Sequence, residues 1–194
     1  MNEILENLAA EVRSCRLCAA HLPLGPRPVL RVSSSARVLI AGQAPSTKVH
    51  ESGMPWNDAS GDRLRRWLDL PRSVFYDETK IAIVPQAFCY PGRGKNGDLP
   101  PPPICQKTWH PRLHTAMPQV ETYILAGRYA QAYHLGNRRK RTLGDTVDAW
   151  REYAPRHFPL PHPSWHNNHW LTANPWFERE LVPVLRQHVH ALLS

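Results

Sequence analysis

Four short apolar runs, separated by segments with helical spacing, constrain the fold of this chain more than any other feature. The runs predict buried strands at residues 37–41, 80–84, 120–126 and 158–160. The segments between and around them predict helices at residues 2–14, 60–70, 105–116, 127–135 and 174–193. Strands that alternate with helices form a mainly parallel sheet. We therefore predict an α/β fold, a single three-layer domain over residues 1–194 with a mainly parallel four-stranded sheet and helices on both faces.

Three details refine this prediction. Ser60 is placed to cap the second helix, and Pro183 predicts a kink or break inside the last one. Residues 90–103 contain so many Gly and Pro residues that they predict a long irregular loop, and loops of this length are usually functional. Ligands of open parallel sheets gather at the carboxyl ends of the strands, where the loops at Gly42 and His162 begin.

The charge of the chain favours a polyanionic partner. The formal net charge is +8 and the isoelectric point is near 9.7. The alternative is that the positive charge only keeps the chain soluble. Nucleic acid is favoured as the partner because the chain has seven Trp residues, which can stack on bases, and twenty Pro residues, which stiffen loops. The basic run at residues 138–141 is interpreted as a solvated loop.

Hydropathy argues against a membrane protein. No apolar stretch approaches the roughly 18 residues needed to span a bilayer, and the segment after Met1 lacks the apolar core of a signal peptide. These features predict a cytoplasmic location.

The four cysteines are the strongest candidate for a metal centre. Cys15 and Cys18 form a CxxC pair, and Cys89 and Cys105 flank the long Gly/Pro loop. Disulfides are disfavoured in the cytosol, whereas four thiolates suit either tetrahedral zinc or a four-iron cluster. The second spacing differs from the repeated CxxC of a zinc ribbon, which favours the cluster. Buried structural cysteines are the alternative.

Together these residues resemble the uracil-DNA glycosylase superfamily, in particular its iron–sulfur class, families four and five. Residues 42–45, Gly-Gln-Ala-Pro, are similar to its first motif, and residues 162–164, His-Pro-Ser, to its second. Residues 52–56 are similar to the stretch whose aromatic residue stacks on the flipped base. The segments FCYPG, GDLPPPP, LPHPSW and NPWFE most closely resemble a further uracil-DNA-glycosylase-like branch.

The resemblance implies a DNA repair glycosylase that flips uracil or another deaminated base out of DNA and hydrolyses its N-glycosidic bond. It implies a monomer whose partner is DNA containing a damaged or deaminated base. It also implies site residues: for catalysis His162, Gln43 and Ala44; for base binding Gly42, Pro45, Trp56 and Gln86; for DNA contact Ser164, Trp165, His166 and Asn167; and for a 4Fe–4S cluster, with zinc as the alternative, Cys15, Cys18, Cys89 and Cys105.

Three positions depart from the family pattern. Ala44 stands where well-studied members carry a carboxylate or an asparagine, Gln43 where the nearer family carries glutamate, and Gln86 where family four reads uracil with asparagine. An iron–sulfur DNA-binding protein with little or no glycosylase activity is therefore the alternative. His162 as an ordinary loop histidine and Trp56 as a core residue are the structural alternatives. Water activation must then come from backbone groups, from His162 or from another acid, for which Glu51, Asp58 and Asp62 are the nearby candidates.

Overall fold

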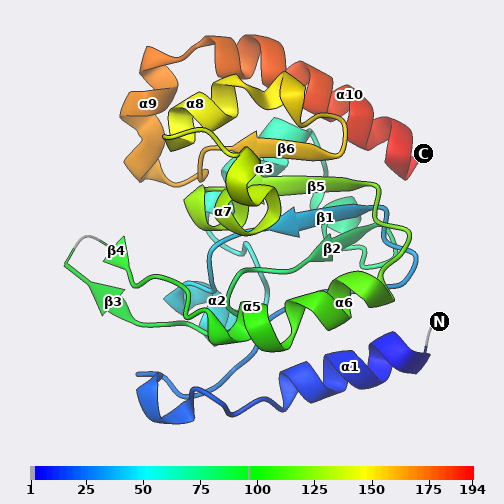
Figure 1. The fold of residues 1–194 in the computed structure, drawn as a ribbon, viewed down its shortest axis with the longest axis vertical. Helices are drawn as coiled ribbons and strands as arrows, with labels where there is room; N and C mark the ends of the chain where they lie inside the picture. Colours follow the sequence, from blue (N-terminus) through cyan, green and yellow to red (C-terminus); the bar gives the residue numbers. More distant parts are fainter. Residues whose placement is uncertain (1–2, 96) are drawn as a thin grey trace.

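A four-stranded parallel sheet forms the centre of the protein (Figure 1). It is seen in a computed structural model that describes residues 3–95 and 97–194. The strand order is β2-β1-β5-β6, and every neighbouring pair is parallel. The strands are β1 (Val38–Ala41), β2 (Ile81–Ile83), β5 (Thr122–Ala126) and β6 (His157–Leu160). The predicted α/β fold is confirmed.

The strands are continuous apolar runs in the sequence because both faces of the sheet are covered. Successive side chains of β1 point to opposite faces. Leu39 and Ala41 join one hydrophobic cluster, whereas Val38 and Ile40 join another, and all four are fully buried.

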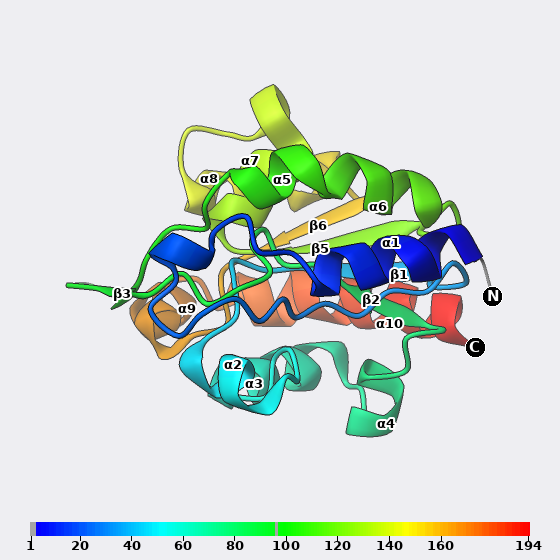
Figure 2. The ribbon, with the colours of Figure 1, turned by 90° about the horizontal axis from the view of Figure 1, so that it is seen from below.

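Helices cover the two faces in separate layers (Figure 2). One face carries α1 (Glu3–Arg13), α5 (Ile104–Thr108), α6 (His110–Ala116) and α7 (Arg128–Leu135). The other face carries α2 (Thr47–Ser52), α3 (Ala59–Leu68), α4 (Arg72–Phe75) and α10 (Val182–Leu193). The remaining elements are α8 (Leu143–Asp148), α9 (Asn168–Ala173), the 3-10 helices η1 (Ala19–His21), η2 (Gly136–Arg138), η3 (Trp150–Glu152) and η4 (Trp165–Asn167), the π-helix η5 (Phe177–Leu181), and the short strands β3 (Arg93–Gly94) and β4 (Gly97–Asp98).

Several predicted boundaries were wrong. The helix predicted to begin with Ser60 as its cap is α3, and its cap is Asp58, whose Oδ1 accepts a hydrogen bond of 3.0 Å from the Gly61 amide. A carboxylate there satisfies a backbone N–H that has no partner within the helix. The predicted helix at 105–116 is two helices that meet at Trp109, because Pro111 lacks the N–H of an interior position and fits a first turn.

Two other segments contain more structure than expected. The long loop at 90–103 includes the antiparallel pair β3 and β4, and the loop after β1 includes α2. The last predicted helix, 174–193, consists of the π-helix η5 and then α10, and Pro183 occupies the first turn of α10, where the helix type changes. Within the described residues, no helix is both long and apolar enough to cross a bilayer.

Candidate active site

The four parallel strands all end at the same edge of the sheet, and a candidate residue follows each of them. Gly42 follows β1, Gln86 lies shortly after β2, Gly127 follows β5, and His162 lies shortly after β6. Backbone hydrogen bonds continue beyond the strands: the Gln86 amide donates to the Gly42 carbonyl (3.0 Å), and the Gly127 amide donates to the Leu160 carbonyl (2.9 Å). The loops at this edge are therefore held together by the extension of the sheet.

Gly42, Trp56 and His162 converge at this edge. A Cβ atom at position 42 would lie only 2.7 Å from Cζ2 of Trp56, so the indole ring lies directly against the glycine backbone. The centroids of the Trp56 and His162 rings are 5.5 Å apart, with planes inclined by 31°. Gly127, at φ +88°, is close on another side of the imidazole, because a Cβ there would lie 3.2 Å from the His162 Cβ. Glycines thus let both rings approach the backbone.

The backbone of Trp56 is strained and firmly held. Its φ of 57° is uncommon for a bulky residue. Its carbonyl accepts hydrogen bonds from Nη1 of the buried Arg65 (3.2 Å) and from the Tyr76 hydroxyl (3.2 Å). Gly61 permits this arrangement, since a Cβ there would lie 1.7 Å from the Trp56 carbonyl oxygen. Strain that several elements maintain together is typical of functional positions.

His162 is neutral at neutral pH. Burial lowers its pKa to about 4, although the Asp58 carboxylate acts in the opposite direction, and His166 lowers it further. A neutral imidazole has one N–H donor and one acceptor nitrogen. The His162 carbonyl accepts a hydrogen bond of 2.7 Å from Nδ2 of Asn167, which ties the turn after the strand to the histidine backbone.

Asp58 is the acid whose charge acts on His162. While Oδ1 caps α3, Oδ2 accepts a hydrogen bond of 3.1 Å from the Ser46 hydroxyl, which belongs to the loop after β1. Of the other two acids considered from the sequence, Asp62 is paired with Arg65 and Glu51 is exposed. Asp58 therefore links the first motif to α3 and influences the charge of His162.

The rest of the first motif is engaged in backbone and packing contacts. Nε2 of Gln43 donates to the Leu99 carbonyl (3.2 Å), and the Gln43 carbonyl accepts from the Ala87 amide (3.0 Å). Ala44 packs against the cluster beneath α1 and α6, and Pro45 is buried. These contacts anchor the loop that carries Gly42.

Gln86 is completely buried beside this loop. Its Oε1 accepts a hydrogen bond of 2.8 Å from Nε2 of Gln106 on α5. Its own Nε2 has no partner among the described residues. A buried donor without a partner is costly, so an acceptor brought by a ligand would stabilise it.

The turn after His162 presents an exposed aromatic pair. Trp165 is 71% exposed, and its ring stacks on His166 with centroids 3.9 Å apart and planes inclined by 27°. The carbonyl of Ser164, just before this pair, accepts a hydrogen bond of 3.1 Å from Nη1 of Arg63 on α3. The turn is thereby held on both sides while its tip faces solvent.

The four cysteines line one apolar cavity, whose volume is about 350 Å³ including its open mouth. Cys15 and Cys18 come from the segment after α1, Cys89 from the segment after β2, and Cys105 from α5. Burial raises the pKa of Cys105 to about 11 and also raises the pKa of Cys18 and of Cys89. In residues 3–95 and 97–194, no three His, Cys, Asp or Glu side chains are arranged to hold a metal ion. The fold therefore brings the four cysteines together around one cavity.

Comparison with known proteins identifies the family. The family model of the uracil DNA glycosylase superfamily matches residues 31–186. The chain belongs to this superfamily. A solved structure similar to this superfamily member is the solution NMR structure of a proposed uracil DNA glycosylase from Methanosarcina acetivorans, with 15% sequence identity, a TM-score of 0.47, and coverage of 81% of this chain and 93% of that chain. The family match includes Gly42, Trp56 and His162, whereas Cys15 and Cys18 precede it.

Sequence reasoning missed several residues that shape this glycosylase-like site. Gly61 and Gly127 were not singled out, and Asp58 was not ranked above the other acids. The sequence around Asp58 did contain a local pattern, because an Asp three residues before a backbone amide in the first turn of a helix is a typical N-cap. The contacts of the glycines are with residues distant in the sequence, which no local pattern reveals.

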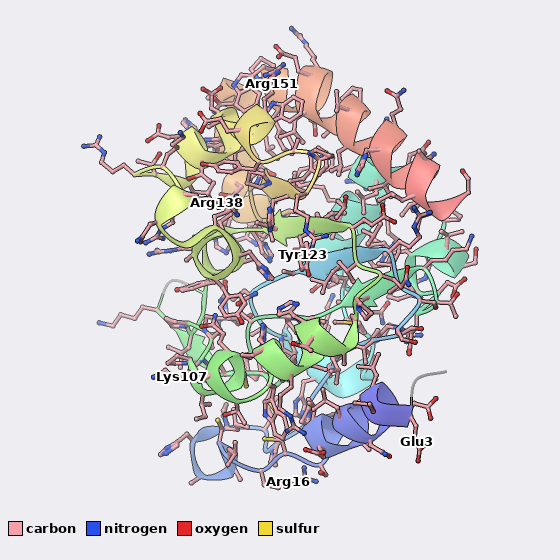
Figure 3. The ribbon with its side chains drawn as sticks, turned by 45° about the vertical axis from the view of Figure 1, so that its right-hand side comes forward. Glu3, Arg16, Lys107, Tyr123, Arg138 and Arg151 are labelled. Carbon is pink, nitrogen blue, oxygen red and sulfur yellow. The ribbon has the colours of Figure 1, made fainter. Side chains whose placement is uncertain are left out.

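Net charge does not locate the DNA-binding surface of this superfamily member. Arg16 and Lys107 lie toward the end formed by α1 and α5, whereas Arg138 and Arg151 lie toward the opposite end (Figure 3). Arg151 forms an ion pair of 2.8 Å with Glu180. In the basic run at 138–141, Lys140 forms an ion pair of 2.6 Å with Glu152. Basic residues therefore occur at both ends of the molecule, and two of them are paired with carboxylates.

Proposed function

We propose that this protein is a DNA glycosylase that hydrolyses the N-glycosidic bond of uracil or another deaminated base in DNA. The observation that carries the proposal is the contact of Trp56 with both Gly42 and His162 at the carboxyl edge of the sheet, in a member of the uracil DNA glycosylase superfamily. In this proposal the partner is DNA with a deaminated or damaged base.

Such an enzyme must extrude the nucleotide, because the glycosidic carbon is inaccessible inside a duplex. The Trp56 ring supplies an aromatic surface for the extruded base. The exposed Trp165 and His166 pair is suited to fill the vacated stack, and Ser164 and Asn167 to contact the backbone beside it. Gly42, Pro45 and Gln86 complete the base-binding residues, with the unpaired Nε2 of Gln86 offering a donor to a base oxygen.

Catalysis requires groups that stabilise the charges that develop as the glycosidic bond breaks. Breaking the bond between the sugar carbon and the base nitrogen leaves positive charge on the sugar and negative charge on the base. The neutral His162 donates a hydrogen bond to the base oxygen, where a preorganised donor lowers the barrier. Asp58 orients the attacking water and accepts its proton as the new carbon–oxygen bond forms, and the base leaves and takes up a proton.

This assignment also accounts for the departures in the first motif. Ala44 has a methyl group packed against the core, and Gln43 is bonded to the Leu99 carbonyl, so neither side chain replaces a carboxylate. Their contribution is to hold the backbone amides of the loop near the base. Asp58, which accepts a hydrogen bond from Ser46 just after this motif, supplies the acid that the motif lacks.

Single-turnover cleavage of uracil-containing oligonucleotides, single- and double-stranded, tests this function. We expect Asp58→Asn and His162→Phe each to lower the rate of abasic-site formation by about 100-fold to 1000-fold, because each removes an interaction with a reacting group. Glu51→Gln, which changes an exposed acid of the same loop, is the matched control and should cleave like the wild type.

The non-catalytic alternative is favoured by one observation, the packed methyl group of Ala44 at a position where other members carry a polar side chain. It predicts no abasic product from any deaminated or alkylated base, together with affinity for such DNA that Trp56→Ala removes. That pair of results would replace the glycosylase proposal.

We also propose that Cys15, Cys18, Cys89 and Cys105 hold a 4Fe–4S cluster, with zinc as the alternative. The shared apolar cavity and the set of four thiols support this. The bound cluster would supply a structural tie rather than a step of hydrolysis. The four thiolates would join the segment after α1 to α5, and closing such a long loop contributes to stability.

Metal removal tests the cluster. We expect protein purified without oxygen to be brown, with iron and acid-labile sulfide in equal amounts, and Cys105→Ser to lose the colour and to unfold at a lower denaturant concentration. A colourless protein with one zinc ion per chain would support the zinc alternative. Protein that is equally stable with and without metal would contradict a structural role for either.

A further inference from the structure

A second pocket lies beside the candidate active site, on the face of the sheet covered by α3 and α10. It has a volume of about 840 Å³ including its open mouth. The helices α3 and α10 pack against one another there, as Figure 2 shows, and η5 and α9 complete the walls. The lining residues are Arg63, Arg66, Trp67, Leu171, Glu178, Val182 and Arg186.

The pocket carries an excess of positive charge. Three arginines face one carboxylate, and Oε1 of that residue, Glu178, already accepts a hydrogen bond of 3.0 Å from Nε1 of Trp67. Arg63 and Arg66 are three residues apart on α3, so they project from the same side of the helix. The guanidinium of Arg66 forms no ion pair or hydrogen bond with any described residue.

Arg186 is held in a fixed orientation. Its Nε donates to the Trp67 carbonyl (2.8 Å) and its Nη2 to the Arg66 carbonyl (2.7 Å). These carbonyls belong to the last turn of α3, where the Arg66 carbonyl also accepts a hydrogen bond of 3.3 Å from the Asp69 amide. The remaining N–H groups of Arg186 are left for a ligand. A preoriented guanidinium is suited to bind phosphate oxygens.

The pocket is joined directly to the second motif. Nη1 of Arg63 donates to the Ser164 carbonyl (3.1 Å), two residues after His162, and α9 continues from that turn into the pocket wall. A DNA strand whose nucleotide enters the site at His162 must pass this turn. The pocket at Arg66 shares Arg63 with this turn.

We propose that this pocket binds a backbone phosphate of the DNA strand next to the extruded nucleotide, with Arg66 and Arg186 as the phosphate ligands and Arg63 as the residue that positions the pocket against the turn. The inference rests on the proposed function for the extruded nucleotide. Phosphate contacts of this kind set the register of a protein on DNA without reading its sequence.

The test uses the salt dependence of DNA binding by Arg66→Gln. The probe is an oligonucleotide with a single 2′-fluorinated deoxyuridine, whose glycosidic bond resists hydrolysis. We expect the variant to bind about 5-fold to 10-fold more weakly at low salt. The slope of log affinity against log salt concentration should become shallower by about 1, which corresponds to the loss of one phosphate contact. Arg13→Gln, which removes the same charge from an exposed position on α1 across the sheet, should bind like the wild type.

A methylphosphonate scan identifies the source of the phosphate. Neutralising one linkage near the modified uridine should weaken binding to the wild type but not to Arg66→Gln. Identical salt slopes for the wild type, Arg66→Gln and Arg13→Gln would overturn the inference. Binding of inorganic phosphate that depends on Arg66, with no linkage singled out by the scan, would overturn it in favour of a free phosphate ligand.

This experiment separates the inference from the function on which it rests. Because the probe is not cleaved, an Arg66-dependent linkage combined with inactivity on ordinary uracil DNA would support the pocket and contradict the glycosylase. Full glycosylase activity with unchanged salt slopes would support the glycosylase and contradict the phosphate pocket.

Discussion

Replacing Gly61 with alanine is expected to lower the free energy of unfolding by about 3 kcal/mol and to displace Trp56 from the candidate active site. The added Cβ would lie 1.7 Å from the carbonyl oxygen of Trp56 and 2.6 Å from its carbonyl carbon. Both are backbone atoms, so no side-chain rotation relieves the overlap. Any shift of that carbonyl also breaks its hydrogen bonds to Arg65 and Tyr76.

A decrease in the free energy of unfolding would point to the overlap with Trp56, because replacing glycine with alanine within a helix otherwise stabilises a protein by roughly 0.5–1 kcal/mol. Urea unfolding measures the stability, and DNA binding measures the position of Trp56. Gly144→Ala is the matched control: Gly144 is also helical, but its added Cβ would lie 3.1 Å from a side-chain atom, Nε1 of Trp170, which can move. Equal stabilities of Gly61→Ala and the wild type would contradict the proposed support of Trp56.

Mild acid is expected to unfold the protein, because a group of buried and half-buried histidines has buried ring nitrogens without hydrogen-bond partners among the described residues. His110 and His114 on α6, His134 on α7 and His157 on β6 are connected through aromatic rings. Tyr123 on β5, labelled in Figure 3, is in ring contact with three of them, with centroids 5.8 Å from His114, 5.2 Å from His134 and 5.4 Å from His157. Ring nitrogens without partners in the described residues are Nδ1 of His110, Nδ1 and Nε2 of His114, Nε2 of His134 and Nδ1 of His157.

Burial is the main cause that lowers the pKa of each of these histidines. The pKa of His110 falls to about 3, with a further contribution from His114, and that of His157 falls to about 4, with contributions from Arg138 and Arg156. The pKa values of His114 and His134 are lowered as well. Because the unfolded chain then binds more protons, stability is complete above a pH of about 6.5 and is lost as the pH falls toward 4 and 3.

The expected loss is on the order of 2 kcal/mol at pH 5 for each of His110 and His157, and together this is a large part of the stability of a domain. Urea unfolding at pH 8, 7, 6 and 5 measures it. His114→Phe removes two unpaired buried nitrogens and should give a shallower dependence on pH while keeping or raising the stability at pH 8. A free energy of unfolding that stays constant from pH 7 to 5 would show that these histidines are charged or solvated in the folded protein.

Local patterns were sufficient for the elements that build the sheet. The apolar runs at 37–41, 80–84 and 120–126 contain β1, β2 and β5, and the run at 158–160 covers β6 except for its first residue, His157. A strand covered on both faces is continuously apolar, which is why these runs mark the strands. Boundaries were less predictable where polar caps decide them, as at Asp58, which caps α3 in place of Ser60. The helix divided at Trp109 shows the same limit, since Pro111 restarts the helix there.

The amino-acid sequence by itself determined the fold class, the motif residues Gly42, Trp56 and His162, and the four cysteines, because strand hydrophobicity and short motifs are properties of neighbouring residues. Only the tertiary structure decided which acid accompanies His162, why Gly61 and Gly127 are required, and where three arginines form a pocket. Each of those features is a contact between residues that are far apart in the chain, and the close packing of the folded protein, rather than any local preference, determines which of them meet.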